Sequence, residues 1–287
     1  MYTGKTKNLG VIGYPIKHSL SPVIQNTAIA DSGIDYAYIA MEIAPEDLKT
    51  AVAGLKATGF CGFNVTIPHK VAIMKHLDEI DESAKIIGAV NTVQIKEGKM
   101  YGYNTDAVGF INPLKKEHIE IKDKTAVILG AGGACRAIIC GLMQNGIKHI
   151  ILGVRNQAKG EKLAQAFVDL VDIKAYDWLS EEFANWLLKA DLLINTTPLG
   201  MQPNIDAMPP VDWEKVNKTA FVYDIVYVPA KTKFLQKAEE CGHATLNGER
   251  MLAEQGAAAL KIWSGAKINV DIMIKALRNF LLNNSSK

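Results

Sequence analysis

The sequence FCGFNVTIPHK, residues 60–70, combines a strand pattern with side chains that could bind hydroxyl groups. Apolar residues up to Ile67 alternate with Asn64 and Thr66, which predicts a strand with one apolar and one polar face. That polar face has two explanations. It is either the solvated side of an edge strand or the floor of a binding site for a polyol, and this stretch alone favours neither.

Lys70 follows this strand at a position where a cation is unexpected. Pro68 ends the strand and can open a helix, so Lys70 would lie in a first turn, where the helix dipole disfavours positive charge. A lysine there is either solvated or used in chemistry. The polar sequence Asn104-Thr105-Asp106 is an ordinary turn or else brings a carboxylate beside Lys70, and such a pair can transfer protons.

Two serines lie on the loop after the first predicted strand, residues 8–12. The following helix is predicted to start at about Pro22 and to end before Gly33, which makes Ser21 a candidate N-cap. Ser19 is then a solvated hydroxyl or a second group that binds a polyol. Loops at the carboxyl ends of strands are where α/β folds bind ligands.

A glycine-rich turn predicts a dinucleotide site. The strand pattern of residues 125–129 runs directly into Gly130, Gly132 and Gly133, and a helix pattern follows. Glycines let the backbone approach a pyrophosphate, and the helix N-terminus offers unpaired N–H groups and a positive dipole end. Cys135 replaces the third glycine of the GxGxxG pattern, so the prediction depends on the strand and helix on either side.

Arg155 follows the next predicted strand, residues 149–154, where NAD sites usually place an acidic residue for the ribose. An arginine there suits a 2′-phosphate, so the sequence favours NADP, and Lys159 is a possible second cation. A solvated loop cation is the alternative for Arg155.

Two α/β domains are needed to position these residues. Further strand patterns cover residues 36–43, 190–195 and 221–226, a helix pattern covers residues 46–58, and two C-terminal helices cover residues 251–264 and 270–282. Glu97 and Gly98 form a turn pair between residues 88–95 and 99–106, which predicts a β-hairpin with one antiparallel strand in an otherwise parallel sheet.

The fold class is therefore α/β, with the C-terminal helices returning to the first domain. We expect a discontinuous N-terminal substrate-binding catalytic domain with a mainly parallel sheet, residues 1–106 and 247–287. A Rossmann-type dinucleotide-binding domain should occupy residues 107–246.

Composition excludes several classes of protein. A net charge of +2 without a lysine-rich run argues against a nucleic-acid partner. The four cysteines lack metal-ligand spacing, so we expect no metal, buried thiols and a reducing cytoplasmic location. No apolar run is long enough for a membrane span or a signal sequence.

The chain resembles the shikimate dehydrogenases and their quinate/shikimate relatives along nearly its whole length. The motifs that carry the resemblance are HSLSP (residues 18–22), GFNVTIPHK (62–70), GAVNT (88–92), GYNTD (102–106), GAGGACRA (130–137), NTTPLGM (195–201), DIVYVPAKT (224–232) and MLAEQG (251–256).

The resemblance implies a reversible reduction of 3-dehydroshikimate to shikimate with a nicotinamide cofactor, in a monomer or homodimer. It implies that Lys70 and Asp106 are the catalytic pair. The substrate would be held by Ser19, Ser21, Asn64, Thr66, Asn91, Tyr227 and Gln255. The residues we predict to bind the cofactor are Gly130, Ala131, Gly132, Gly133, Ala134, Arg155, Thr196, Val226 and Gly248.

Two departures from the family pattern bear on these expectations. Val154 and Asn156 flank Arg155 where NADP-dependent members have Asn and Thr, so NAD stays possible beside NADP. Gln25 replaces a histidine in the first helix, for which we expect a small local effect. The alternatives are an NAD-dependent quinate/shikimate dehydrogenase of quinate catabolism, a folate-type dehydrogenase and a non-catalytic NAD(P)-binding regulator.

Overall fold

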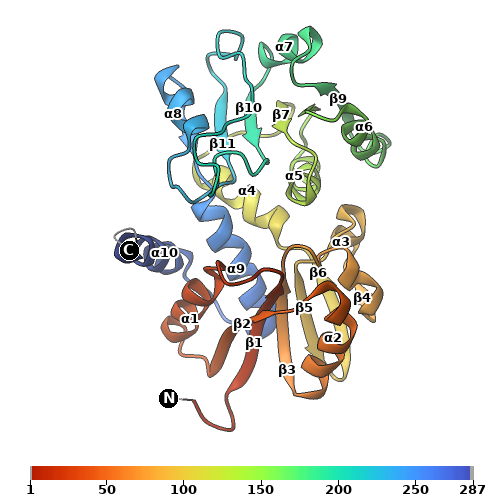
Figure 1. Cartoon of the computed structure of the whole chain (residues 1–287), viewed down its shortest axis with the longest axis vertical. Helices are drawn as coiled ribbons and strands as arrows, with labels where there is room; N and C mark the ends of the chain where they lie inside the picture. The colour runs from red at the N-terminus through yellow and green to blue at the C-terminus, as the bar shows by residue number, and fades with distance from the viewer. Residues whose placement is uncertain (1, 285–287) are drawn as a thin grey trace. The chain divides into compact units, whose positions relative to one another are not determined.

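The computed structural model describes residues 2–284 and divides the chain into two compact units. The first unit contains the residues up to Gly109 together with those from Leu252 onward, and the second contains Phe110–Met251. The chain passes from one unit to the other within α4 (Asp106–Lys116) and within α9 (Glu249–Ser264). Each unit is built on its own six-stranded sheet (Figure 1).

The sheet of the first unit has the order β2-β1-β3-β5-β6-β4. Its strands are β1 (Lys7–Gly13), β2 (Tyr36–Glu42), β3 (Phe60–Val65), β4 (Glu79–Ile80), β5 (Thr92–Lys96) and β6 (Lys99–Tyr103). β5 runs antiparallel to β3 and β6, while the other pairs are parallel. The predicted single antiparallel strand in a mainly parallel sheet is confirmed.

The β5–β6 hairpin has the turn that its sequence predicts. Lys96 pairs with Lys99, and the two residues between them have positive φ angles, 52° at Glu97 and 74° at Gly98. Positive φ at both central positions is the geometry of a type I′ turn, whose twist matches that of the two strands.

Helices flank this sheet. They are α1 (Ser21–Asp31), α2 (Leu48–Ala57), α3 (Glu82–Ile87), most of α9 and α10 (Val270–Asn284), with short 3₁₀ helices η1 (Pro45–Asp47) and η2 (Ala72–His76). α10 packs against α1 although the two helices are at opposite ends of the chain (Figure 1). The C-terminal helices therefore complete the first unit, as the sequence predicts.

Trp263 of α9 fixes that helix on the sheet at one point. Its Nε1 donates to the carbonyl oxygen of Val93 (2.9 Å), and its indole ring lies against Gly62 of β3. A Cβ at Gly62 would overlap the indole and would lie 2.5 Å from the Val93 oxygen. Only glycine leaves room for this contact.

The sheet of the second unit is wholly parallel, in the order β12-β11-β10-β7-β8-β9. Its strands are β7 (Thr125–Leu129), β8 (His149–Val154), β9 (Asp172–Asp177), β10 (Leu192–Asn195), β11 (Phe221–Asp224) and β12 (Thr245–Leu246). This order is that of the Rossmann fold, with the reversal between β7 and β10. The predicted Rossmann-type domain is confirmed.

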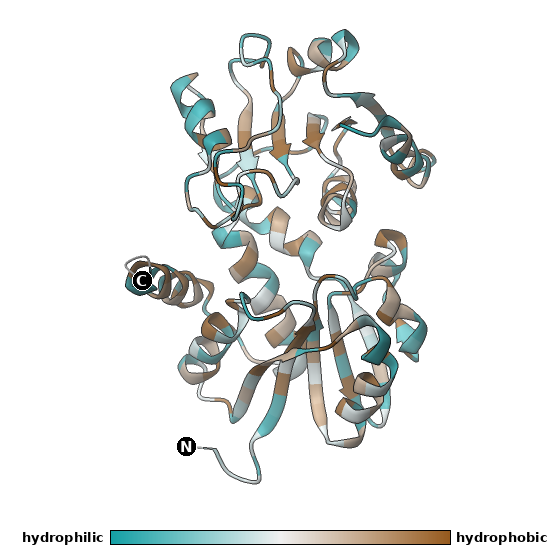
Figure 2. Ribbon diagram, viewed as in Figure 1, coloured by the Kyte–Doolittle hydropathy of each residue, from teal (hydrophilic) through white to brown (hydrophobic). Residues whose placement is uncertain are grey.

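Four helices connect strands of this sheet: α5 (Gly133–Gln144), α6 (Gln157–Gln165), α7 (Glu181–Leu187) and α8 (Lys233–Glu240). The central strands β7 and β10 are buried along their length, and Figure 2 colours them as hydrophobic. Strands covered on both faces by helices are expected to be apolar throughout. The two faces carry separate buried clusters, one around Ile128 and the other around Val127.

Two local predictions around residues 60–70 are wrong. β3 ends at Val65, and Ile67 is 74% exposed while Asn64 is buried, so the polar and apolar faces are not as predicted. Pro68 does not open a helix. Residues 67–71 form turns because the His69 N–H bonds to the Thr66 carbonyl, and the 3₁₀ helix η2 begins only at Ala72.

Three smaller predictions also fail. Ser21 is the first residue of α1 and not its N-cap, which is Leu20, and no side chain caps the helix. The helix predicted over residues 46–58 is divided into η1 and α2. Of the four cysteines, Cys135 and Cys140 are buried, but Cys61 and Cys241 are only half-buried.

No helix within residues 2–284 is long and apolar enough to cross a membrane.

Substitution of Gly62 tests the contact between α9 and the sheet. We expect Gly62→Ala to lower the free energy of unfolding by about 1–3 kcal/mol, because the new Cβ meets both the indole and a backbone carbonyl. Gly54→Ala is the matched control, since nothing lies within 4 Å of the Cβ position in α2. It should raise stability by ~0.5–1 kcal/mol. Urea unfolding measures both, and equal effects would contradict the proposed overlap.

Candidate active site

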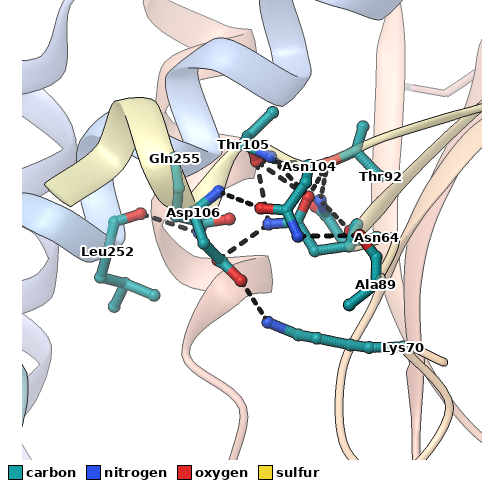
Figure 3. A network of polar contacts seen from close by, with 10 residues as sticks. Asn64, Lys70, Ala89, Thr92, Asn104, Thr105, Asp106, Leu252 and Gln255 are labelled. Atoms are coloured by element: carbon teal, nitrogen blue, oxygen red, sulfur yellow. Dashed lines mark hydrogen bonds and ion pairs between the residues drawn. The ribbon is translucent and has the colours of Figure 1, made fainter. Parts of the chain in front are cut away.

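Lys70 and Asp106 form an ion pair in the first unit (Figure 3). The Lys70 Nζ lies 2.5 Å from the Asp106 Oδ2, and their side chains are 25% and 12% exposed. The pair is therefore largely enclosed but still reaches solvent. Within residues 2–284 Lys70 donates to Asp106 alone, so two of its three N–H groups are available to a ligand.

Backbone hydrogen bonds hold the turn that carries Lys70 against the segment before β5. The Val90 N–H donates to the Lys70 carbonyl (2.8 Å), and the Val65 N–H donates to the Asn91 carbonyl (2.8 Å). The buried His69 ring is fixed as well, because its Nε2 donates to the Ile43 carbonyl (2.7 Å). Lys70 is thus positioned by the turn that replaces the predicted helix.

Asp106 is the first residue of α4 and is held by the polar sequence before it. Asn104 accepts from the Asp106 N–H (3.0 Å) and donates through its Nδ2 to the Ala89 carbonyl (2.9 Å). The sequence predicts either an ordinary turn or a carboxylate beside Lys70, and the structure has both at once. The turn is what directs the carboxylate.

The buried amide of Asn91 connects the pair to the sheet. Its Nδ2 donates to the Asp106 Oδ1 (2.8 Å) and to the Thr105 hydroxyl (3.0 Å). Its Oδ1 accepts from the Thr105 N–H (2.8 Å) and from the Thr92 hydroxyl (2.9 Å). With both amide groups bonded, the orientation of the Asn91 side chain is fixed.

Asn64 extends this network to Tyr38 of β2. The Asn64 Nδ2 donates to the Thr92 hydroxyl (3.0 Å) and to the Asn91 carbonyl (3.1 Å), and its Oδ1 accepts from the Tyr38 hydroxyl (2.6 Å). Burial raises the pKa of Tyr38 well above its usual value, and a side-chain hydrogen bond with Ser21 partly offsets this effect. A continuous chain of hydrogen bonds thus runs from α1 to Lys70.

The other predicted substrate residues of this unit are less tightly held. Ser19 accepts from the Ser21 N–H (3.3 Å), and Thr66 is placed by the bond from its N–H to the Ile12 carbonyl (2.9 Å). Gln255 donates to the Leu252 carbonyl of its own helix (2.9 Å). The side chains of these four predicted residues are half-buried, which leaves their polar atoms accessible to a ligand: Ser19, Ser21, Thr66 and Gln255. Tyr227 belongs to the second unit, and burial raises its pKa.

Sequence reasoning did not select Tyr38, Thr92 or Thr105 as site residues, although all three belong to the network. Thr92 and Thr105 lie inside motifs that the resemblance identified. Tyr38 carries one available signal, since a tyrosine that is buried on one face of a strand needs a partner for its hydroxyl. The sequence does not reveal that the partner is Asn64.

In the second unit the glycine turn lies where the strand order reverses. Gly130 has a φ of 108° and follows β7, and Thr196 follows β10. Both the N–H and the hydroxyl of Thr196 donate to the Leu129 carbonyl (2.9 and 2.8 Å). A Cβ on Gly130 would lie 2.9 Å from the Thr196 hydroxyl, so the two loops meet closely only because this residue is glycine.

The start of α5 fits a dinucleotide. Gly132 and Gly133 are exposed, and nothing lies within 4 Å of their Cβ positions, which leaves room for a pyrophosphate. α5 has no side-chain cap and no acidic residue in its first turn, so its N–H groups and positive dipole end are available. Ala131 and Ala134, on either side of the two glycines, are half-buried.

The cations predicted for a 2′-phosphate lie together at the end of β8. Arg155 is exposed immediately after the strand, and Asn156 caps α6 by accepting from the Lys159 N–H (3.0 Å). This cap places exposed Lys159 in the first turn of the helix. Both side chains are free of ion pairs within residues 2–284 and can turn toward an anion.

The remaining predicted cofactor residues lie on two hydrogen-bonded loops. The Gly248 N–H donates to the Val226 carbonyl (3.0 Å), and the Val226 N–H donates to Oδ1 of Asp224 (3.0 Å). Asp224 also accepts from the Asn195 Nδ2 (3.0 Å), next to Thr196. One buried carboxylate therefore connects the contact between Val226 and Gly248 to Asn195, the residue before Thr196. Within residues 2–284 no group of His, Cys, Asp and Glu could hold a metal ion.

Models of known families match most of the chain. The shikimate dehydrogenase substrate-binding domain matches residues 11–93, shikimate/quinate 5-dehydrogenase matches residues 113–208, and the shikimate 5′-dehydrogenase C-terminal domain matches residues 248–278. Together these matches cover both ends of the first unit and the glycine turn of the second.

Named relatives are similar over nearly the full length. Proteins named shikimate dehydrogenase (NADP(+)) from Methanocaldococcus jannaschii and Synechocystis sp. are 44% and 47% identical to this chain, over 96% and 97% of it and 98% and 97% of their own lengths. The crystal structure of shikimate 5-dehydrogenase from Listeria monocytogenes in complex with shikimate and NAD has a TM-score of 0.92 at 35% identity, over 96% of this chain and 98% of that one.

Asp224 makes stability depend on pH. Burial raises its pKa from 3.8 to about 6, against the opposing effect of its hydrogen bonds. The folded protein then binds more protons than the unfolded chain between about pH 4 and pH 6, so Asp224 adds stability at low pH that is lost as the pH rises through 6. Asparagine is neutral throughout. We expect Asp224→Asn to be more stable than the native protein by about 3 kcal/mol at neutral pH, and the difference should shrink to ~0.5 kcal/mol near pH 4.

Urea unfolding of the two proteins across this pH range measures the difference. Asp169→Asn is the matched control, because Asp169 is an exposed carboxylate of the same unit. A variant that is less stable than the native protein at neutral pH would show that ionised Asp224 stabilises the fold.

Proposed function

Because this chain belongs to the shikimate dehydrogenase family, we propose that it catalyses the reversible, NADP-dependent reduction of 3-dehydroshikimate to shikimate. The observation that carries the proposal is the enclosed Lys70–Asp106 pair, bordered by a network of groups that bind hydroxyls. The Rossmann-type sheet with its open glycine turn supports the choice of a dinucleotide cofactor.

The nicotinamide cofactor supplies the hydride when it is bound, held by the glycine turn and α5, by the cations after β8 and by the loops that carry Thr196, Val226 and Gly248. In the reductive direction, negative charge develops on the ketone oxygen that becomes a hydroxyl. Lys70 as an ammonium donates a hydrogen bond to that oxygen and then a proton, which is general acid catalysis. Its N–H groups that do not bond Asp106 are suited to this role.

Asp106 orients Lys70 and binds a neighbouring hydroxyl of the substrate. Oδ2 accepts from Lys70 and Oδ1 accepts from Asn91, so each oxygen keeps a lone pair for another donor. In the oxidative direction the same lysine accepts the proton of the alcohol.

The hydroxyl and amide groups predicted for the substrate in the first unit match a small ring with several hydroxyls and a carboxylate. We assign substrate binding to Ser19, Ser21, Asn64, Thr66, Asn91, Gln255 and Tyr227. Such polar sites discriminate strongly against ligands that leave their buried groups unpaired. A pterin would need an apolar slot, so the folate-type alternative is not supported.

NADP is the proposed cofactor. Arg155 and Lys159 provide the charge that a 2′-phosphate needs, and the relatives from Methanocaldococcus and Synechocystis are named for NADP. The Listeria relative was crystallised with NAD, so weaker use of NAD is part of the proposal. The quinate-catabolic and regulatory alternatives are not favoured by these relatives. We further propose a cytoplasmic location, since all four cysteines are free. A monomer or homodimer is proposed from the resemblance to the family.

Removal of either member of the ion pair tests the chemistry. We expect Lys70→Ala to lower kcat for shikimate oxidation by ~10²–10⁴-fold, because the proton acceptor is lost. Asp106→Asn should lower it by at least ~100-fold, since a neutral amide orients lysine poorly. Lys85→Ala is the matched control, because Lys85 pairs with Glu82 on the surface of α3. Folding is checked by circular dichroism, and near-native turnover in either folded variant would refute the assignment.

A two-by-two assay of shikimate and quinate with NADP and NAD tests substrate and cofactor together. We expect shikimate with NADP to give the highest kcat/KM. Arg155→Ala should raise KM for NADP by ~10-fold or more and leave KM for NAD nearly unchanged, because only NADP carries the 2′-phosphate. Lys174→Ala, an exposed lysine of β9, is the control. An equal effect on both cofactors would show that Arg155 does not bind this phosphate.

A further inference from the structure

We propose that Asp224 is a positioning residue whose ionised carboxylate holds the loops after β10 and β11 in the arrangement that binds NADP(H). This inference rests on the proposed function, because the loops carry Thr196, Val226 and Gly248, to which we assign cofactor binding. Asp224 itself is fully buried at the end of β11, so it acts through other residues and touches no ligand.

Donors from three separate segments converge on this carboxylate. Oδ1 accepts from the side chain of Asn195 at the end of β10 (3.0 Å) and from the Val226 N–H on its own loop (3.0 Å). Oδ2 accepts from the hydroxyl of Thr232, the N-cap of α8 (2.6 Å). Burial and these donors set the protonation of Asp224, and no ionised side chain contributes to it.

On the β10 side, Asn195 passes the constraint to the loop with Thr196. Its Oδ1 accepts from the N–H (2.9 Å) and the hydroxyl (2.7 Å) of Thr197, and its backbone carbonyl accepts from the Ile225 N–H (3.1 Å). The Nδ2 of Asn195 donates to Asp224 (3.0 Å) and has a longer contact with the Leu199 carbonyl of the same loop (3.5 Å). The carboxylate therefore helps to set the orientation in which Asn195 holds Thr197.

On the β11 side, the bond from Asp224 to Val226 fixes a close backbone contact. The Gly248 N–H donates to the Val226 carbonyl, and a Cβ on Gly248 would overlap the Ile225 carbonyl. Backbones packed this closely tolerate little displacement. A shift of Val226 would therefore move Gly248 with it.

The acceptor must be ionised for all three donors to be satisfied. A carboxylate only accepts, whereas a neutral acid or an amide must donate through one of its two atoms. If Asp224 donates to the Thr232 hydroxyl, that oxygen accepts from both Asp224 and the Leu235 N–H that begins α8 (3.3 Å), and the Thr232 proton loses Asp224 as its acceptor. Neutral Asp224 thus loosens the loop at Thr232, beside which Gly200 of the β10 loop packs.

The ionised carboxylate lowers stability, as its raised pKa requires, yet it organises these loops. A buried charge that destabilises the fold is expected where it fixes a functional arrangement. Asp224→Asn should therefore change the stability of the fold and the affinity for the cofactor in opposite directions. We expect the variant to be more stable and to bind the cofactor more weakly.

The test measures NADPH affinity by nicotinamide fluorescence across about pH 5–8 for native protein, Asp224→Asn and the exposed control Asp169→Asn. The 2′-phosphate titrates near pH 6 in every sample, so the quantity compared is the ratio of Kd values at each pH. We expect Asp224→Asn to bind NADPH ~5–10-fold more weakly at the alkaline end, with the ratio approaching unity at the acid end.

An affinity of Asp224→Asn equal to that of native protein at alkaline pH, or a ratio that is constant with pH, would overturn the inference. Native protein that neither binds NADPH nor oxidises shikimate would instead refute the proposed function.

A second pair of variants, at Thr232, tests the same inference if Asp224→Asn does not fold. Thr232→Val should weaken NADPH binding and move its pH dependence upward, and Thr232→Ser should behave as native protein. Identical behaviour of the two would again overturn the inference.

Discussion

The hydrogen-bond requirement of one buried amide determines the geometry of the candidate active site. Asn91 is only 3% exposed, and an amide at that depth must satisfy both its donor and its acceptor group. It does so by fixing Thr105 on one side and Asp106 on the other, which leaves Asp106 one direction in which to meet Lys70. Thr92 donates to the Asn91 amide oxygen, and Asn64 donates to the Asn91 backbone carbonyl, so the polar interior of the sheet and the ion pair are connected through one residue.

In the second unit the buried group that must be hydrogen-bonded is the carboxylate of Asp224 in place of an amide. Asn91 is neutral and can both donate and accept, so it joins groups of both kinds. Asp224 in its ionised form accepts only, so it gathers donors from β10, its own loop and α8. The amide at the centre of the first arrangement does not titrate. The second depends on a proton because burial brings the pKa of Asp224 to about 6.

Much of the fold could be predicted from sequence because its signals are local. The Glu97-Gly98 turn and the strand that runs into Gly130 each express their geometry within a few residues. The turn at Pro68 could not be predicted in this way. The local bond from His69 to Thr66 closes it, but the bond from Val90 to the Lys70 carbonyl, which joins segments about twenty residues apart, holds it in place. A proline that can open a helix was instead placed in a turn by tertiary contacts.

The site divides in the same manner. Lys70 and Asp106 stand out because a cation and a carboxylate occur at unusual positions in motifs. Tyr38 was missed because its only polar atom is matched by Asn64, 26 positions away. The N-cap prediction at Ser21 failed because Leu20 occupies that position and Ser21 already has helical geometry. Pairing between distant segments is information that one sequence read locally does not contain.

The bond between Trp263 and Val93 joins residues 170 positions apart, and the whole second unit lies between them in the chain. During synthesis the second unit is therefore complete before the first can be. Gly62 and Val93 emerge early but lack their indole partner until the ribosome has reached α9. The unit that we assign to the substrate is therefore synthesised first but completes its fold last. Until α9 and α10 have been synthesised, its sheet lacks part of its helical cover and is exposed to other chains.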